Sequence, residues 1–157
     1  MKITLLVTGK TDADCWADAM KEYTARLKHY LSFDVETIPD LKNVGRLSAE
    51  QHKEREGHLI LNVMQTGDYV VLLDERGKEM TSRQFSQFLE KRLQMPHKRT
   101  LFVTGGPFGF SNEVYKRADE KLSLSKMTFS HQMIRAIFVE QLYRAMTIIR
   151  GEKYHHE

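Results

Sequence analysis

The residues most suited to chemistry lie in a glycine-rich loop. Gly105, Gly106 and Gly109 follow the apolar run 100–104, and glycines let a backbone approach a ligand closely. The pattern is neither the G-x-G-x-x-G of dinucleotide sites nor a Walker loop, because no G-K-[ST] follows it. Two interpretations stay open: a ligand-binding loop, or a glycine-rich turn that enters a helix.

Two further segments are expected beside this loop. Residues 73–78 and 125–130 each follow a run that is typical of a strand. In open parallel sheets, ligands bind beyond the carboxyl ends of the strands, so all three segments are candidates for one site. Asp74 and Glu75 are adjacent, and neighbours on an extended strand point to opposite faces. We therefore expect a solvated strand end there rather than a paired carboxylate site.

Two histidines are candidates for binding or proton transfer. Tyr154 offers an aromatic face and His155 a group that titrates near neutral pH, a pair suited to base stacking or proton handling. A frayed polar end is the alternative for this tail. His131 stands at the start of the last helix, where an N-cap or a neutral packed imidazole is the simplest interpretation.

Basic residues occur in small groups that include Arg135 and Arg144. Together with Tyr143 and Tyr154 they could form a surface that follows RNA phosphates and stacks on bases. Each group alone is equally typical of a solvated helix face. No metal site is expected, because the seven histidines are scattered and Cys15 is the single cysteine.

The spacing of apolar residues predicts the strands and helices that position these residues. Apolar and β-branched runs predict five strands, at 2–8, 33–38, 69–73, 100–104 and 121–125. Apolar residues three and four apart predict five helices, at 14–30, 48–65, 81–93, 111–118 and 130–149. Strands that alternate with helices indicate an α/β protein with a mostly parallel sheet flanked by helices.

Helix starts are also visible in the sequence. Capping boxes are predicted at two places, Ser48 with Gln51 and Thr81 with Gln84. Ser130 is expected to cap the last helix. Residues 50–56 of the second helix are almost wholly polar, so we expect that half to be solvated and only the following turns to dock.

Length and composition place these elements in a single domain, 1–157. One core typically serves about 100–200 residues, and 41% hydrophobic residues exclude a disordered chain. No apolar run approaches the roughly 18 residues of a membrane span, and a lone cysteine excludes a disulfide framework and fits the cytoplasm. The net charge of +3 permits an anionic partner but is far from that of a basic nucleic-acid tail.

Several motifs together resemble one known family. They are Met1-Lys2-Ile3, Leu73-Asp74 followed by Gly77-Lys78, Gly105-Gly106-Pro107-x-Gly109, Leu122-Ser123-Leu124-Ser125-x-Met127-Thr128, His131, Glu140–Ala145 and Tyr154-His155. In order and register they resemble the ribosomal large-subunit pseudouridine N3-methyltransferases (RlmH), of the SPOUT class. The resemblance covers essentially the whole chain, whereas the glycine loop alone would not be specific.

The resemblance implies a fold and a cofactor. SPOUT methyltransferases carry a C-terminal trefoil knot, which no periodicity in the sequence reveals, and the knot binds S-adenosylmethionine. The implied cofactor-binding residues are Leu73, Gly105, Gly106, Leu124, Ser125, Lys126, Met127, Thr128 and Phe129. The implied reaction is methyl transfer to N3 of a pseudouridine in 23S rRNA of the assembled ribosome.

The resemblance also implies roles and partners. His155, Tyr154 and Arg144 are the expected catalytic residues, with His155 handling the proton or positioning the base and Tyr154 packing against it. His131 and Arg135 are expected to bind substrate. A homodimer is implied, in which the tail of one subunit approaches the cofactor pocket of the other. Two alternatives stay open: a nucleotide- or flavin-binding module without catalysis, and an inactive ribosome-associated factor.

Overall fold

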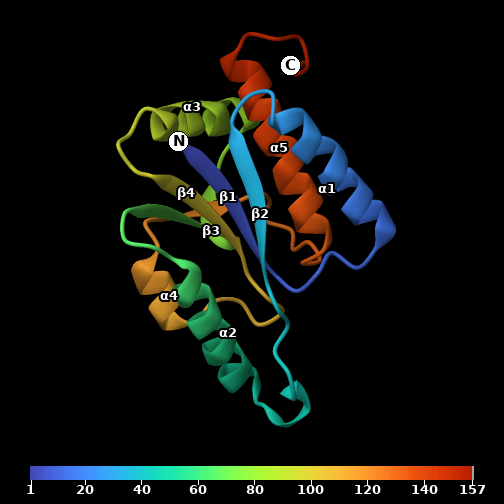
Figure 1. The fold of residues 1–157 in the computed structure, drawn as a ribbon, viewed down its shortest axis with the longest axis vertical. Coiled ribbons are helices and arrows are strands. Elements are labelled where there is room, and N and C mark those ends of the chain that lie inside the picture. Colours follow the sequence, from blue (N-terminus) through green and yellow to red (C-terminus); the bar gives the residue numbers. More distant parts are fainter. Residues whose placement is uncertain (157) are drawn as a thin grey trace.

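A single parallel sheet organises the chain. The computed structural model describes residues 1–156. Within them five strands pair in the order β2-β1-β4-β3-β5, all parallel (Figure 1). The strands are β1 (Lys2–Thr8), β2 (Ser32–Ile38), β3 (Asp68–Glu79), β4 (Arg99–Thr104) and β5 (Glu120–Ser123). The predicted α/β class and parallel sheet are confirmed.

Helices cover both faces of this sheet. They are α1 (Asp14–Leu27), α2 (Ala49–Val63), α3 (Ser82–Leu93), α4 (Asn112–Arg117) and α5 (Met133–Ile149), with a short 3₁₀ turn, η1 (Val44–Arg46), before α2. On one face α1 and α3 pack against α5, and on the other α2 packs against α4 (Figure 1). The trefoil knot that the resemblance implies stays a prediction.

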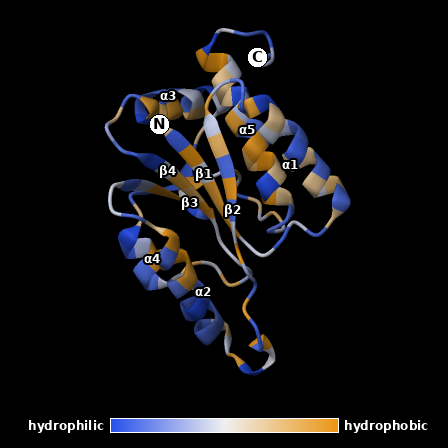
Figure 2. Cartoon of the chain, in the orientation of Figure 1, coloured by the Kyte–Doolittle hydropathy of each residue, from blue (hydrophilic) through white to orange (hydrophobic). Residues whose placement is uncertain are grey.

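The apolar strands are buried because each has two covered faces. Along β1, Ile3, Leu5 and Val7 join the core under α1, α3 and α5, whereas Leu6 joins the core under α2 and α4. All four are almost fully buried. A parallel sheet with helices on both sides therefore needs continuous rather than alternating apolar runs, and Figure 2 shows the central strands coloured as hydrophobic.

Side chains cap the helices as the sequence predicts. Both capping boxes are present, Ser48 with Gln51 and Thr81 with Gln84. The last helix begins at Met133, three residues after Ser130, but the Ser130 hydroxyl does accept the Met133 amide at 3.1 Å. These side chains satisfy amides that have no partner within the helix.

Strand β3 is longer than predicted. Instead of ending at Leu73 it continues to Glu79, with a register shift against β5 between Leu73 and Lys78. At Gly77 an added Cβ would lie 2.6 Å from the backbone nitrogen of Leu122. Only glycine permits that close approach of the two strands.

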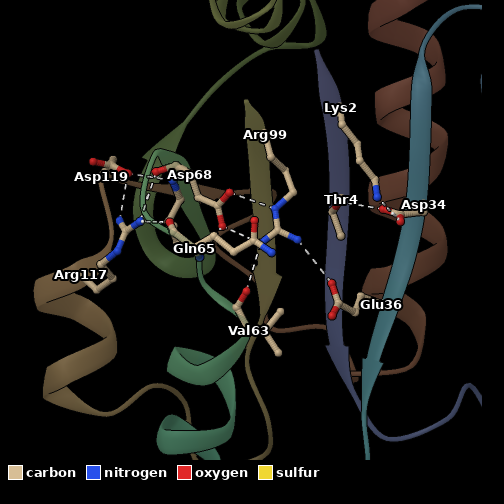
Figure 3. Close-up of polar contacts among 11 residues, drawn as sticks. Lys2, Thr4, Asp34, Glu36, Val63, Gln65, Asp68, Arg99, Arg117 and Asp119 are labelled. Atoms are coloured by element: carbon tan, nitrogen blue, oxygen red, sulfur yellow. Dashed lines mark hydrogen bonds and ion pairs between the residues drawn. The ribbon is translucent and has the colours of Figure 1, made fainter. Parts of the chain in front are cut away.

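A network of ion pairs joins the amino ends of the strands (Figure 3). The Arg99 guanidinium donates to both carboxylate oxygens of Asp68, at 3.0 and 2.5 Å, and to the Val63 carbonyl at 3.1 Å. The Asp68 side chain is only 2% exposed. Arg117 adds hydrogen bonds to the carbonyls of Gln65 and Asp68. The network lies at the sheet edge opposite the glycine-rich loop.

Removing Arg99 should destabilise the fold. In Arg99→Ala the buried Asp68 carboxylate loses its main partner, so the free energy of unfolding should fall by about 3 kcal/mol. Arg26→Ala is the matched control, because the Arg26–Glu22 ion pair is exposed and exposed pairs contribute little. Urea denaturation of both variants measures the difference, and equal midpoints would contradict the role of Arg99.

Candidate active site

A cavity of about 370 Å³ opens at the carboxyl edge of the sheet. Its walls come from the second half of β3, the loop after β4 and the segment between β5 and α5. Eight residues predicted to bind the cofactor line it: Leu73, Gly105, Gly106, Leu124, Ser125, Met127, Thr128 and Phe129. His131 lines it too. The structure thus brings together three segments that are up to about fifty residues apart in the sequence.

Lys126 is the predicted cofactor residue that the cavity leaves out. Its side chain is 84% exposed, and its ammonium group lies 3.6 Å from the Glu79 carboxylate. Among the residues that line the cavity it is not included, although Ser125 and Met127 on either side are. The structure thus gives no support to a place for the Lys126 side chain in the cavity wall.

Two carboxylates line the cavity. Asp74 accepts a short hydrogen bond from the Tyr115 hydroxyl, and Glu75 accepts one from Thr128 at 2.6 Å. Burial and the bond to Asp74 raise the pKa of Tyr115 to about 12, so its proton stays in place at neutral pH. The expectation of a solvated position holds for Glu75, which is exposed, whereas Asp74 is half-buried; the strand does not end here, and both residues line the cavity.

The ionisable side chains of the cavity wall are mainly acidic. Asp74 and Glu75 are acidic, and the set of lining residues contains no lysine or arginine. Phosphate groups are commonly held by cationic side chains together with a helix N-terminus, and of these the wall offers only the start of α5, at Ser130 and His131. The wall favours instead a ligand that is neutral or positively charged.

Glu56 is a residue of this region that the sequence analysis missed. It lies in the helix half that was expected to be solvated, yet it is 3% exposed. Its carboxylate accepts the backbone amide of Gly106 at 2.9 Å. The available signal was its spacing: Glu56 precedes the buried Ile60 by one helical turn, so both lie on the docked face of α2.

The three predicted catalytic residues also form a group, but away from the cavity. Arg144 donates to Glu140 at 2.6 Å, and its guanidinium lies 4.8 Å from the centre of the Tyr154 ring. The Tyr154 hydroxyl donates to Glu140 at 3.0 Å and lies 3.4 Å from the Tyr23 hydroxyl. Burial and these hydrogen bonds raise the pKa of Tyr154 well above its ordinary value, so it remains a proton donor.

Helix α5 separates this group from the cavity. Ile134, in its first turn, lines the cavity, whereas Arg144 stands ten residues later. At 1.5 Å per residue that is about 15 Å along the helix axis. Figure 1 shows α5 running away from the carboxyl ends of the strands towards the C-terminus. The tail therefore does not contribute to the cavity of its own chain.

The contact between Arg144 and His155 determines which ring nitrogen carries the proton. Arg144 Nη1 lies 3.2 Å from His155 Nδ1. Because a guanidinium can only donate, Nδ1 must be the acceptor and the proton of the neutral ring must sit on Nε2. In this arrangement Nδ1 of His155 is occupied as an acceptor.

The placement of Arg135 does not support the prediction that it binds substrate. It is 1% exposed. Its guanidinium donates to the carbonyls of Thr8 at 2.6 Å, Gly9 at 2.8 Å and His131 at 3.0 Å. These bonds tie the first turn of α5 to the carboxyl end of β1. Burial among backbone carbonyls gives Arg135 a structural role and keeps its guanidinium away from the surface where RNA phosphates would bind.

Comparison with known proteins decides the family. The family model described as "Predicted SPOUT methyltransferase" matches residues 1–155. The chain belongs to this SPOUT methyltransferase family. It is 63% identical to "Ribosomal RNA large subunit methyltransferase H" of Parabacteroides distasonis and 57% identical to the protein of that name from Bacteroides fragilis, each over the full length of both chains. The resemblance inferred from the sequence motifs is confirmed.

A solved structure supports the fold of this SPOUT methyltransferase. It is "a probable methylase family protein from Haemophilus influenzae Rd KW20", with a TM-score of 0.55 and 12% sequence identity, and the match covers 99% of this chain and 70% of that one. At such identity the likeness concerns the fold alone. Within residues 1–156 no cluster of three or more His, Cys, Asp or Glu could hold a metal ion. In the same residues no helix has the length and apolarity that a membrane span requires.

Arg135→Gln should lower stability before it affects any substrate. The shorter amide cannot reach all three carbonyls, so the free energy of unfolding should fall by about 2–3 kcal/mol as buried acceptors lose their donors. Arg55→Gln, at an exposed position of α2, should leave it unchanged. Thermal unfolding of both variants measures this. Wild-type stability combined with weakened ribosome binding would instead restore the substrate role of Arg135.

Proposed function

We propose that the chain uses S-adenosylmethionine to methylate N3 of a pseudouridine in 23S rRNA on the assembled ribosome, in the cytoplasm. Relatives named as large-subunit rRNA methyltransferases match the chain over its full length. The observation that carries the proposal is the cavity with two carboxylates and no cationic side chain at the carboxyl edge of the sheet. It suits a methyl donor that bears a sulfonium and an ammonium group.

The residues of the cavity fit such a cofactor. The volume of about 370 Å³ is in the range of small-ligand sites. At Gly105 and Gly106 no side chain separates the backbone from a ligand in the cavity. Leu124 and Met127 offer apolar surface for an adenine ring. The carboxylates of Asp74 and Glu75 supply charge opposite to that of the ligand.

The chemistry requires loss of one proton and transfer of one methyl group. When bound, S-adenosylmethionine supplies an electrophilic methyl carbon on its sulfonium sulfur. N3 of pseudouridine would give its proton to solvent, and the new N–C bond would form as the methyl–sulfur bond breaks, which would leave the sulfur as a neutral thioether. With Arg144 at Nδ1, His155 would hold the target base by donating from Nε2 to a carbonyl oxygen of the ring. Tyr154 remains protonated and would pack beside the base.

We further propose that the working unit is a homodimer. Within one chain the tail group lies at the far end of α5 from the cavity, so Tyr154 and His155 can act only on the cavity of a second copy. Two such composite sites would form in a symmetric dimer.

The alternative functions differ from this proposal in measurable ways. A nucleotide- or flavin-binding module is disfavoured by the absence of lysine and arginine among the residues that line the cavity. An inactive ribosome-associated factor would keep the same cavity but transfer no methyl group.

Calorimetry and rRNA analysis test the proposed reaction. The purified chain should bind S-adenosylmethionine in the micromolar range and transfer labelled methyl groups to ribosomes, and a deletion strain should lose a single methylpseudouridine by mass spectrometry of 23S rRNA. Binding without transfer would favour the inactive factor. Absence of binding at sub-millimolar cofactor would rule out the methyltransferase proposal.

Mixing two inactive variants tests the composite site. His155→Ala lacks a working tail, and Leu124→Arg places a cation in the cavity. In a mixed dimer the intact cavity of the first variant meets the intact tail of the second. After random subunit exchange, activity should return to about a quarter of the wild-type level. The control mixture, His155→Ala with Tyr154→Ala, should stay inactive. No recovery in the first mixture, from chains that do form mixed dimers, would contradict the composite site.

A further inference from the structure

A buried carboxylate stands directly behind the glycine-rich loop. Glu56 reaches from α2 to Gly106, whose amide donates to Oε1 at 2.9 Å. Burial raises the pKa of the Glu56 carboxyl, and the bond from Gly106 partly opposes that rise. Neither the proposed methyl transfer nor the tail group uses this residue.

Gly106 and Glu56 fit each other sterically. A Cβ atom added at Gly106 would lie 2.4 and 2.5 Å from the two carboxylate oxygens, which real Cβ atoms do not tolerate. The Gly106 carbonyl in turn accepts the Gly109 amide at 3.1 Å and closes the turn of the loop. The carboxylate therefore fixes the residue on which the turn is built.

The bond to Glu56 also orients one peptide group. In a trans peptide the carbonyl of residue 105 and the amide of residue 106 point in opposite directions. Since the amide points to Glu56 on α2, the Gly105 carbonyl points away from α2. Gly105 and Gly106 line the cavity, whereas Glu56 does not. The carboxylate thus fixes the orientation of a peptide group at the wall of the cavity.

We propose that Glu56 is a positioning residue for the methyl donor: by holding the Gly106 amide it presents the Gly105 carbonyl to a hydrogen-bond donor of the cofactor. This inference rests on the function proposed above and extends it to a residue outside the cavity. The same helix face holds the loop a second time, because the His52 ring, one turn before Glu56, meets the Phe108 ring edge-on with centroids 5.0 Å apart.

Two substitutions at position 56, one that keeps the acceptor oxygen and one that removes it, test the hydrogen bond to Gly106. Glu56→Gln keeps an acceptor oxygen for Gly106, whereas Glu56→Ala removes it. Calorimetry with S-adenosylhomocysteine, a stable cofactor product, should give a dissociation constant raised about tenfold or more in Glu56→Ala and changed less than about threefold in Glu56→Gln. Glu54→Ala, exposed on the same helix, is the matched control and should bind as the wild type does.

Amide hydrogen exchange gives a readout that needs no ligand. In the free protein, exchange at Gly106 should become about tenfold faster or more in Glu56→Ala and stay close to wild type in Glu56→Gln. The amide of Phe102, in the middle of β4, is the internal reference and should keep its protection. Equal exchange at Gly106 in all variants, or loss of protection at Gly106 and Phe102 together, would overturn the positioning role.

The outcomes distinguish this inference from the function on which it rests. If the wild-type chain does not bind S-adenosylhomocysteine, the proposed function fails whatever position 56 does. If the wild type binds and Glu56→Ala binds equally well, only the role of Glu56 is wrong.

Discussion

All strands of the sheet run in one direction, and this constraint determines where everything else can be. Helices must return the chain over the faces, so both faces are covered and the strands become continuous apolar runs. The two sheet edges then take different roles. At the amino ends of the strands lies the Arg99–Asp68 ion pair. At their carboxyl ends lie the loops that form the cavity. The buried ion pair and the cavity thus lie at opposite ends of the same strands.

Helix α5 connects the cavity with the tail. Its first turn is tied by Arg135 to the carbonyls of Thr8 and Gly9, which places Ile134 at the cavity. Glu140, near its middle, and Arg144, one turn later, hold Tyr154 against the helix. Because a straight helix keeps its two ends apart, the cavity and the tail group are separated within one chain. A second copy resolves this separation under the proposed function.

The sequence predicts the fold well where a local pattern determines the structure. Apolar runs such as 69–73 identified the strands, and capping boxes marked two helix starts. It fails where the deciding contact is remote. Glu56 is buried because its partner lies fifty residues later, and Arg135 because its acceptors lie at the end of β1. The family motifs did collect eight residues of the cavity, but no local pattern could show that the Lys126 side chain points out of it.

The acidic wall has a consequence for turnover. With the proposed donor, the ligand enters carrying a sulfonium charge and leaves as a neutral thioether. Asp74 and Glu75, without a cation among the lining residues, attract the first form more than the second. Under the proposed function, their position would let the reaction itself weaken the binding of its product.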